Sequence, residues 1–200
     1  MKLKLVILIL LVLLASNLCA FDGKRKGFLL GFGMGFANVS FNQEYSGYEG
    51  SFKSDTEKKT GMATDFKIGF APNNKVELYY SSQIAWISIV NAYMEEVGIT
   101  DGVGTFSLSY FLSPKLNKME WAPSPYLSCG YGFSTWDAYE EEESDSWTGN
   151  GWFIGAGYEF SKHYRASINL FMNDPSISFY GESITTNSTA ILFTLSAMAF

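Results

Sequence analysis

Alternation between large apolar and small side chains, repeated in eight segments, is the feature of this sequence that most restricts its fold. Between Gly27 and Phe41 the even positions carry mainly large apolar residues, and the odd positions are mostly glycine or alanine. A period of two places successive side chains on opposite faces of a β-strand. We therefore expect an all-β chain, with strands at 27–41, 61–71, 75–87, 103–112, 126–136, 151–160, 164–172 and 188–200.

The face opposite the large apolar residues consists of glycine, serine and alanine with few charges. Such a face covers a soluble protein poorly, but it fits the crowded interior of a narrow barrel. Tilted strands of about ten residues are long enough to cross a bilayer. The pattern predicts an eight-stranded antiparallel up-and-down transmembrane β-barrel whose large apolar face contacts lipid. The alternative is a soluble lipocalin-like barrel, in which the apolar face would line an internal pocket.

The last segment leaves its own orientation open, because both of its faces carry apolar residues. One face holds Leu192, Met198 and Phe200, whereas the other holds Ile191, Phe193 and Leu195.

The connections between segments alternate in length, as they do in outer-membrane barrels with short periplasmic turns and longer extracellular loops. Residues 72–74 and 161–163 are tight turns, and the connection at 113–125 is an exception because it is long where a short turn is expected. Two levels of outward aromatic residues are consistent with the two membrane interfaces. The long polar connections are 42–60, 88–102, 137–150 and 173–187. The outward aromatic residues are Trp86 and Trp152 at one level and Phe70, Tyr110, Tyr158, Phe160 and Tyr164 at the other.

The N-terminus has the basic start, short apolar run and small final residue of a secretory signal peptide. We expect residues 1–20 to be removed after Ala20, which leaves 21–200 as the barrel domain. A retained anchor and acylation of Cys19 are the alternatives, although Leu18 occupies the place where lipoprotein signals carry a small residue. After cleavage Cys129 is the one remaining cysteine, so no internal disulfide can form.

Three stretches resemble the small outer-membrane barrels of the OmpA/OmpX type: residues 27–33, 125–132 and 157–160. The C-terminal Phe200 also resembles the terminal aromatic residue by which the barrel-assembly machinery recognises that class. The resemblance implies a location in the outer membrane of a Gram-negative envelope. It also implies outer-membrane lipid, lipopolysaccharide and the assembly machinery as partners.

Catalytic, cofactor-binding and metal-binding motifs are not evident. His163 is the only histidine and lies in a tight turn, so we interpret it as a solvated turn residue, whereas Ser167 points into the lumen. That separation makes a lipid-modifying enzyme a weak alternative. The acidic run 140–145 is interpreted as a solvated extracellular loop that could meet a ligand. Removing Lys2 and Lys4 takes the formal charge from −6 to −8, which argues against nucleic acid as a partner.

The small face also predicts what fills the barrel. The three-residue connection 161–163 places Glu159 opposite Arg165, so we expect these two side chains to pair. We predict a non-catalytic structural or surface-interaction barrel with a plugged lumen, with a narrow channel for small polar solutes as the alternative. The predicted inward charges are Asp65, Lys67, Glu77, Glu159 and Arg165, and the predicted inward aromatic residues are Tyr79, Phe111, Tyr126, Phe153 and Phe171.

Overall fold

The computed structural model describes residues 25–48, 50–90, 95–112, 123–138 and 147–200, and the elements in them are all β-strands. The predicted signal peptide, the acidic run 140–145 and most of the connection 113–125 lie outside the described residues. In the part of the chain that is described, no helix is long and apolar enough to cross a membrane. The strands are β1 (Gly27–Gly47), β2 (Gly50–Lys53), β3 (Glu57–Asn73), β4 (Val76–Val90), β5 (Glu96–Phe111), β6 (Ser124–Ala138), β7 (Trp147–Ser161), β8 (Tyr164–Asn173), β9 (Ser176–Phe179) and β10 (Glu182–Ala199).

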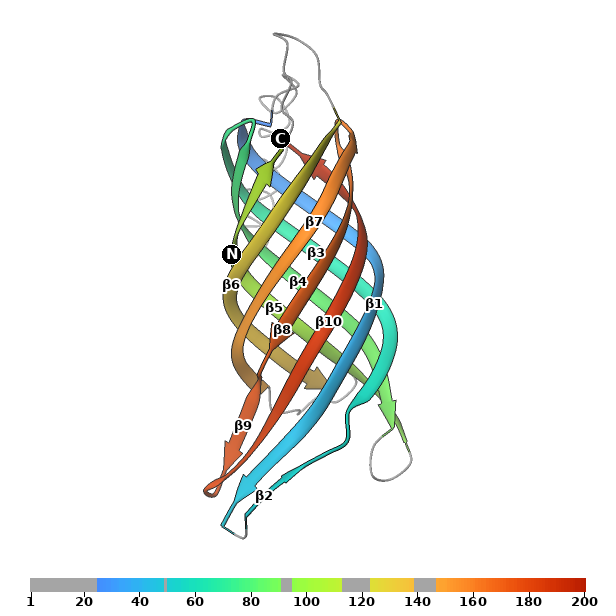
Figure 1. The fold of residues 1–200 in the computed structure, drawn as a ribbon, viewed down its shortest axis with the longest axis vertical. Helices are drawn as coiled ribbons and strands as arrows, with labels where there is room; N and C mark the ends of the chain where they lie inside the picture. The colour runs from blue at the N-terminus through green and yellow to red at the C-terminus, as the bar shows by residue number, and fades with distance from the viewer. Residues whose placement is uncertain (1–24, 49, 91–94, 113–122, 139–146) are drawn as a thin grey trace, which may run out of the picture.

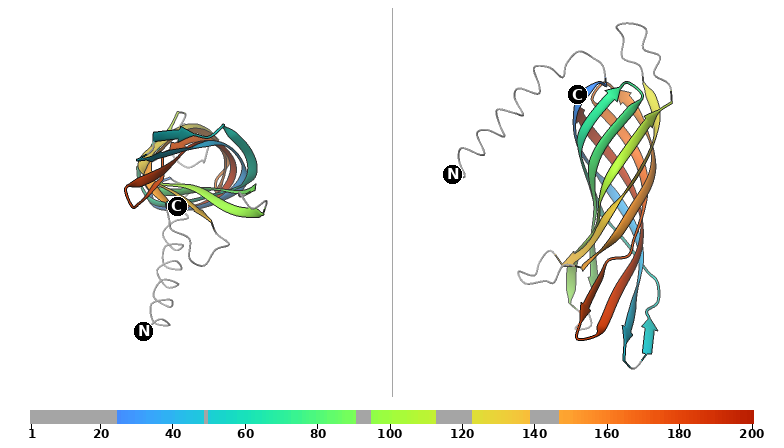
Figure 2. Two further views of the ribbon diagram at one scale, coloured as in Figure 1. Left: turned by 90° about the horizontal axis from the view of Figure 1, so that it is seen from below. Right: turned by 90° about the vertical axis from the view of Figure 1, so that its left-hand side faces the viewer.

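Eight of these strands form a closed antiparallel ring, as the sequence predicts. Each pairs with its neighbour in the order β1-β3-β4-β5-β6-β7-β8-β10, and β10 pairs back onto β1. The closing ladder is long, running from Leu30 opposite Ala199 to Ser46 opposite Ser183. The tilted strands and the ring are visible in Figure 1 and, along the axis, in the left view of Figure 2. The short strands β2 and β9 extend this ring by pairing with β1 and β10.

The two ends of the barrel differ. We call one the short-turn end, because it contains the tight connections from β3 to β4 and from β7 to β8; the C-terminus lies there (Figure 1). We call the other the hairpin end, because the β1–β2 and β9–β10 hairpins project from it (Figure 1). The strands are longer here than expected, since parts of 42–60 and 173–187 are strand instead of loop. Backbone pairing needs no apolar side chains, so the ladders continue where the apolar pattern stops.

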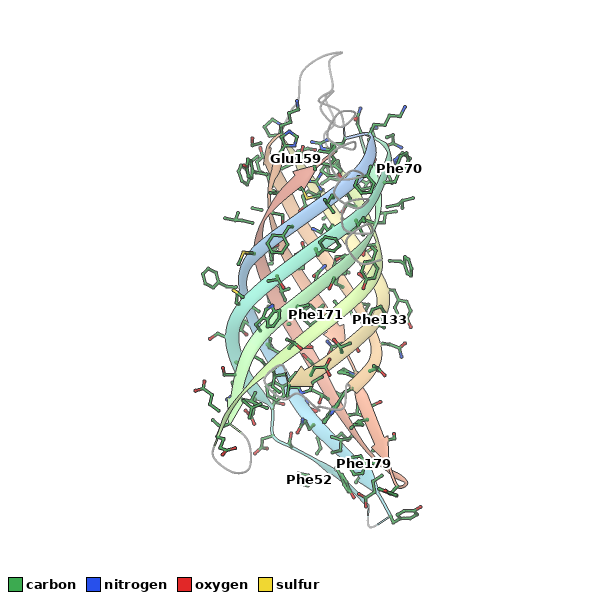
Figure 3. The ribbon with its side chains drawn as sticks, turned by 180° about the vertical axis from the view of Figure 1, so that it is seen from behind. Phe52, Phe70, Phe133, Glu159, Phe171 and Phe179 are labelled. Carbon is green, nitrogen blue, oxygen red and sulfur yellow. The ribbon has the colours of Figure 1, made fainter. Side chains whose placement is uncertain are left out.

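The outer face carries the large apolar residues, which is the reverse of a soluble protein. Phe32, Phe66 and Leu195, for example, are exposed, whereas their chain neighbours point into a filled interior. This orientation settles the last strand, because Ile191, Phe193 and Leu195 face outward and Leu192, Met198 and Phe200 face inward. Figure 3 shows these side chains around the wall, with Phe70 near the short-turn end and Phe133 further along. A closed barrel with an apolar outer band is the form that β-strands take in a lipid bilayer.

Candidate functional site in the barrel lumen

Six charged side chains are buried together inside the short-turn half of the barrel. We call them the charge cluster, and each is exposed by 5% or less: Arg25, Asp65, Lys67, Glu77, Glu159 and Arg165. Strand alternation turns five of these positions inward, whereas Arg25 lies just before β1; Glu159 appears at this end of the barrel in Figure 3. Three of the six are cationic and three are anionic, so the formal charge of the cluster is zero.

Arg165 on β8 is the centre of the cluster. Its Nη1 and Nη2 donate to the two carboxylate oxygens of Glu77 at 2.8 and 2.6 Å, and its Nε donates to Glu159 Oε2 at 2.9 Å. The other carboxylate oxygen of Glu159 accepts from Arg25 Nε at 2.8 Å. Glu159 is therefore bridged by two arginines, and the chain Arg25–Glu159–Arg165–Glu77 joins four parts of the barrel wall. Bidentate arginine–carboxylate pairs of this kind are among the strongest charge-assisted hydrogen bonds.

Asp65 and Lys67 form a separate ion pair on β3. Two residues apart on one strand, they share the inner face, and Lys67 Nζ lies 2.8 Å from Asp65 Oδ2. The same ammonium group lies 5.8 Å from the centre of the Tyr79 ring. This pair is local in the sequence, whereas the contacts of Arg165 cross the lumen.

Aromatic rings surround the two arginines. The guanidinium carbon of Arg25 lies 4.2 Å from the ring centre of Phe111, and that of Arg165 lies 5.0 Å from the same ring. Arg165 is also 5.5 Å from Tyr126 and 5.0 Å from Phe200. These distances are within the range of cation–π attraction, which is stronger where water is excluded.

The glycines of the inner face make room for these large side chains. A Cβ on Gly130 would lie 2.5 Å from the Phe153 ring and 2.5 Å from Ser107 Oγ. In the same way the ring of Tyr126 occupies the space beside Gly157. The glycine-rich face is therefore the counterpart of the lumenal aromatic residues and not an empty wall.

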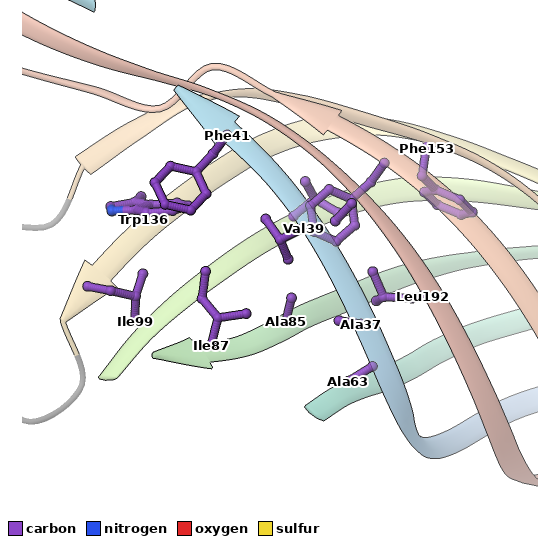
Figure 4. Close-up of a cluster of buried hydrophobic side chains, with 13 residues drawn as sticks. Ala37, Val39, Phe41, Ala63, Ala85, Ile87, Ile99, Trp136, Phe153 and Leu192 are labelled. Carbon is purple, nitrogen blue, oxygen red and sulfur yellow. The ribbon is translucent and has the colours of Figure 1, made fainter. Parts of the chain in front are cut away.

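The hairpin half of the lumen holds a second group of buried side chains, and these are apolar. Phe153, Phe171 and Leu192 belong to this cluster, and Phe41 packs on Trp136 with ring centres 4.9 Å apart (Figure 4). Asp101 is buried at this level, where it accepts hydrogen bonds from Asn173 Nδ2 at 2.7 Å and from Ser188 Oγ. The full set is Ala37, Val39, Phe41, Ala63, Ala85, Ile87, Ile99, Val103, Trp136, Phe153, Phe171, Ala190 and Leu192.

The five charges singled out in the sequence are all placed in the lumen, and Glu159 lies opposite Arg165 in the β7–β8 ladder. Sequence reasoning missed Arg25, because this residue precedes the first predicted strand. The predicted inward charges gave a signal for a further cation but not its identity, because Asp65, Glu77 and Glu159 outnumber Lys67 and Arg165 by one. It also missed Glu77 as the bidentate partner of Arg165, because β4 and β8 are not neighbours.

His163 and Phe200 pack together at the short-turn end. His163 is half-buried, and its Nδ1 lies 3.0 Å from the carbonyl oxygen of Met198. His163 lies in the turn as predicted, but it is only partly exposed, because the turn packs on the end of β10. Phe200 is buried with its ring centre 6.3 Å from that of His163. Ser167, in contrast, hydrogen-bonds Thr194 Oγ1 at 2.7 Å inside the lumen. Among the described residues, no group of three or more His, Cys, Asp and Glu side chains is arranged to hold a metal ion.

Four exposed aromatic residues form a further candidate surface at the far end, and we call them the hairpin tips: Tyr48, Phe52, Phe179 and Tyr180. Tyr180 is 99% exposed and Tyr48 is 86% exposed. The two hairpins contact each other, because a Cβ on Gly181 would lie 2.6 Å from the Tyr48 hydroxyl oxygen. Nearby, a hydrogen bond to Glu182 raises the pKa of the Tyr45 hydroxyl above its usual value. Figure 3 labels Phe52 and Phe179 at this end.

No family model and no curated protein matches the chain by sequence. Solved structures do match it. OprG, an outer membrane protein of Pseudomonas aeruginosa, is 12% identical over 88% of this chain and 98% of its own, with a TM-score of 0.48. AlkL, an outer membrane protein solved in lipid bilayers, is 11% identical over 88% and 91%, with a TM-score of 0.48. The Escherichia coli outer membrane protease OmpT is 8% identical over 88% and 97%, with a TM-score of 0.38. These likenesses concern the fold alone; the closed ladder and the apolar outer face of this chain are those of a β-barrel that spans a membrane.

The pairing of Glu77 with Arg165 can be tested by urea unfolding in lipid vesicles. We expect Glu77→Gln and Arg165→Met each to destabilise the barrel by about 3 kcal/mol, because each leaves a buried charge without its partner. The double variant should lose less than the sum, because Arg25 and Glu159 remain paired and neutral. The exposed pair Glu57 and Lys59, 3.4 Å apart, serves as the control and should contribute less than about 1 kcal/mol. Simple addition of the two single effects would show that Glu77 and Arg165 are not coupled.

Proposed function

We propose that this chain is a non-catalytic outer-membrane barrel, closed by its own side chains, that presents the hairpin end outside the cell for contact with another surface. The observation that carries the proposal is the charge cluster, in which three cations and three anions cancel inside the lumen. Charges lining an open aqueous pore are hydrated and need no partner at bonding distance. Here each member of the chain Arg25–Glu159–Arg165–Glu77 is bonded to the next, which favours a plug.

Closure is supported a second time by the apolar cluster of the hairpin half. A polar solute would first have to pass Phe153, Phe171 and Leu192 and then the arginines stacked on Phe111. An eight-stranded barrel is only wide enough for side chains to fill. Two different barriers in series would oppose both charged and neutral solutes.

A narrow channel for small polar solutes remains the second candidate because of the residues between the two barriers. The oxygen of the Gln83 amide and the nitrogen of the Asn169 amide are buried without a hydrogen-bond partner, as is the Ser196 hydroxyl. Buried polar atoms of this kind are normally satisfied by protein or ordered water. A hydrated middle section is compatible with a closed barrel, and it is also what a gated channel would need.

The proposal of no catalysis is supported by the hydrogen bonds of the two candidate residues. The imidazole of His163 faces the end of β10 and the hydroxyl of Ser167 faces Thr194. Nucleophilic catalysis requires base and nucleophile within hydrogen-bonding reach of each other. The pairing observed for each residue instead serves to hold the short-turn end together.

Surface contact is proposed for the hairpin tips because the two hairpins project from the end of the barrel (Figure 1) and their aromatic side chains are exposed. Tyr180 and Gly181 form a two-residue turn with φ of +49° and +86°. At the first position of such a turn, asparagine is preferred to tyrosine. A bulky residue held in a left-handed conformation at full exposure is a reason to suspect function. Tyrosine, serine and glycine dominate these hairpins, as they do binding loops that need rigid aromatic contacts and adaptable polar ones.

The same proposal covers export and assembly. Residues 1–20 would direct export and be removed, so that the mature chain begins at Phe21. The barrel-assembly machinery would recognise the end of β10 with Phe200, and lipid and lipopolysaccharide would surround the wall. An extracellular ligand would meet the hairpin tips or the acidic connection at 140–145.

Conductance in planar bilayers tests the closure. We expect the wild-type barrel to show at most rare, small openings. Replacing Phe111, Tyr126, Phe153 and Phe171 with alanine should produce steady ion conductance, because it removes two large rings from each of the two barriers. The matched control replaces four lipid-facing aromatic residues, Phe106, Tyr131, Phe133 and Phe193, and should stay closed; a gel-mobility shift on boiling verifies that each variant is folded. Stable, large conductance of the wild type would instead favour the channel.

Cysteine labelling of intact cells tests the orientation. In a Cys129→Ser background, Tyr180→Cys should react with a membrane-impermeant maleimide, because the hairpin tips are then outside the cell. Lys162→Cys, in the tight turn between β7 and β8, is the control and should react only after the outer membrane is broken. Labelling of Lys162→Cys and protection of Tyr180→Cys in intact cells would reverse the orientation and overturn the surface-contact proposal.

A further inference from the structure

An apolar groove is cut into the outer wall of the barrel over β5, β6, β7 and β8. Its volume is about 570 Å³, and its lining is almost entirely apolar. The large side chains along it, such as Leu108, Ile154 and Ile168, point away from the lumen and are exposed. The groove is therefore separate from the charge cluster and from the hairpin tips.

The strand register explains why the wall is hollow at this place. One cross-strand row runs Leu108–Cys129–Ile154–Leu170, and the next runs Tyr110–Leu127–Ala156–Ile168. Each row contains one small residue, Cys129 in the first and Ala156 in the second, and the two lie on adjacent strands. Behind them the inward pair Ser128 and Gly155 is also small. The depression is thus built from side-chain size at fixed positions of a rigid ladder.

We infer that this groove is a binding site for one acyl chain of a phospholipid. Its opening is continuous with the apolar band that contacts lipid, so hydrocarbon is the material that reaches it. The groove includes Tyr110, which belongs to the aromatic level of the short-turn end. Tyrosine at that level sits at the headgroup boundary. The acyl chain therefore belongs to a phospholipid of the leaflet on the side of the short-turn end. In the orientation proposed above, with the hairpin end outside the cell, this is the periplasmic leaflet. The identification of that leaflet as periplasmic rests on the proposed function, and the rest of the inference does not.

An acyl chain in this groove contacts protein on several sides, whereas an acyl chain elsewhere on the wall contacts protein on one side and other lipids on the rest. Contacts with Leu108, Ile154 and Ile168 flank it, and Cys129 and Ala156 lie beneath it. Van der Waals contact is the main attraction available between apolar surfaces in a membrane, and it increases with the number of atoms in contact. The occupant should therefore be retained longer than lipid on the convex parts of the wall.

Native mass spectrometry of the barrel purified from cells in mild detergent tests the inference. We expect the wild type to retain one phospholipid when the micelle is removed. The double variant Cys129→Leu/Ala156→Leu fills both small positions. The fraction of barrel detected with bound lipid should be at least tenfold lower than for the wild type. The matched control, Ala197→Leu/Ala199→Leu, enlarges two residues of the outer side of β10 away from the groove and should retain the lipid.

A second measurement does not depend on lipid remaining bound when the detergent micelle is removed. Spin-labelled phosphatidylethanolamine in vesicles should show an immobilised component with the wild type that decreases in the filled variant, and a gel-mobility shift verifies that both are folded. Absence of bound phospholipid on the wild type, retention of lipid A in its place, or equal retention by the filled variant would each overturn the inference. None of these results bears on whether the lumen conducts, so the failure of this inference and the failure of the proposed function are distinguishable.

Discussion

The ladder between β1 and β10 closes the sheet, and the rest of the structure depends on that closure. Inside hydrocarbon an unpaired backbone N–H or C=O costs several kcal/mol, so a β-sheet can span a membrane only without edges. Closing eight strands leaves an interior with room for side chains and little else. Large apolar residues are therefore directed to the lipid, and each large lumenal ring needs a small partner, as Tyr126 has in Gly157.

Under the proposed closure, a narrow lumen also dictates how charges are held. Burying an isolated ion costs several kcal/mol even after relaxation, so the cations and anions of the charge cluster must cancel and bond to one another. Arg25 illustrates this requirement within the charge cluster, because a residue before the first strand turns inward to Glu159. With the lumen closed as proposed, the surfaces that we assign to interaction are the hairpin tips and the outer wall with its groove.

The fold and much of the lumen could be predicted from sequence because alternation is a local property. The outward set on β1 and the pairing of Glu159 with Arg165 follow from a period of two and a three-residue connection. The contact between Arg165 and Glu77 could not be predicted, because it joins strands that are not neighbours and depends on the tilt and register of the whole ring. The strand extensions and the exposure of Tyr180 were missed for another reason: polar ladders leave no apolar pattern. The groove requires the register of four strands at once.

The most direct test of the central claim, that a neutral cluster of bonded charges closes the barrel, is the distance between the Arg165 guanidinium and the Glu77 carboxylate in lipid. Solid-state NMR dipolar recoupling between ¹⁵N-labelled arginine and ¹³C-labelled glutamate carboxylate can measure it in bilayers. The account predicts a direct bidentate contact, with N–O distances near the 2.6 and 2.8 Å found here. A hydrated Arg165 with no dipolar coupling to Glu77 would contradict it.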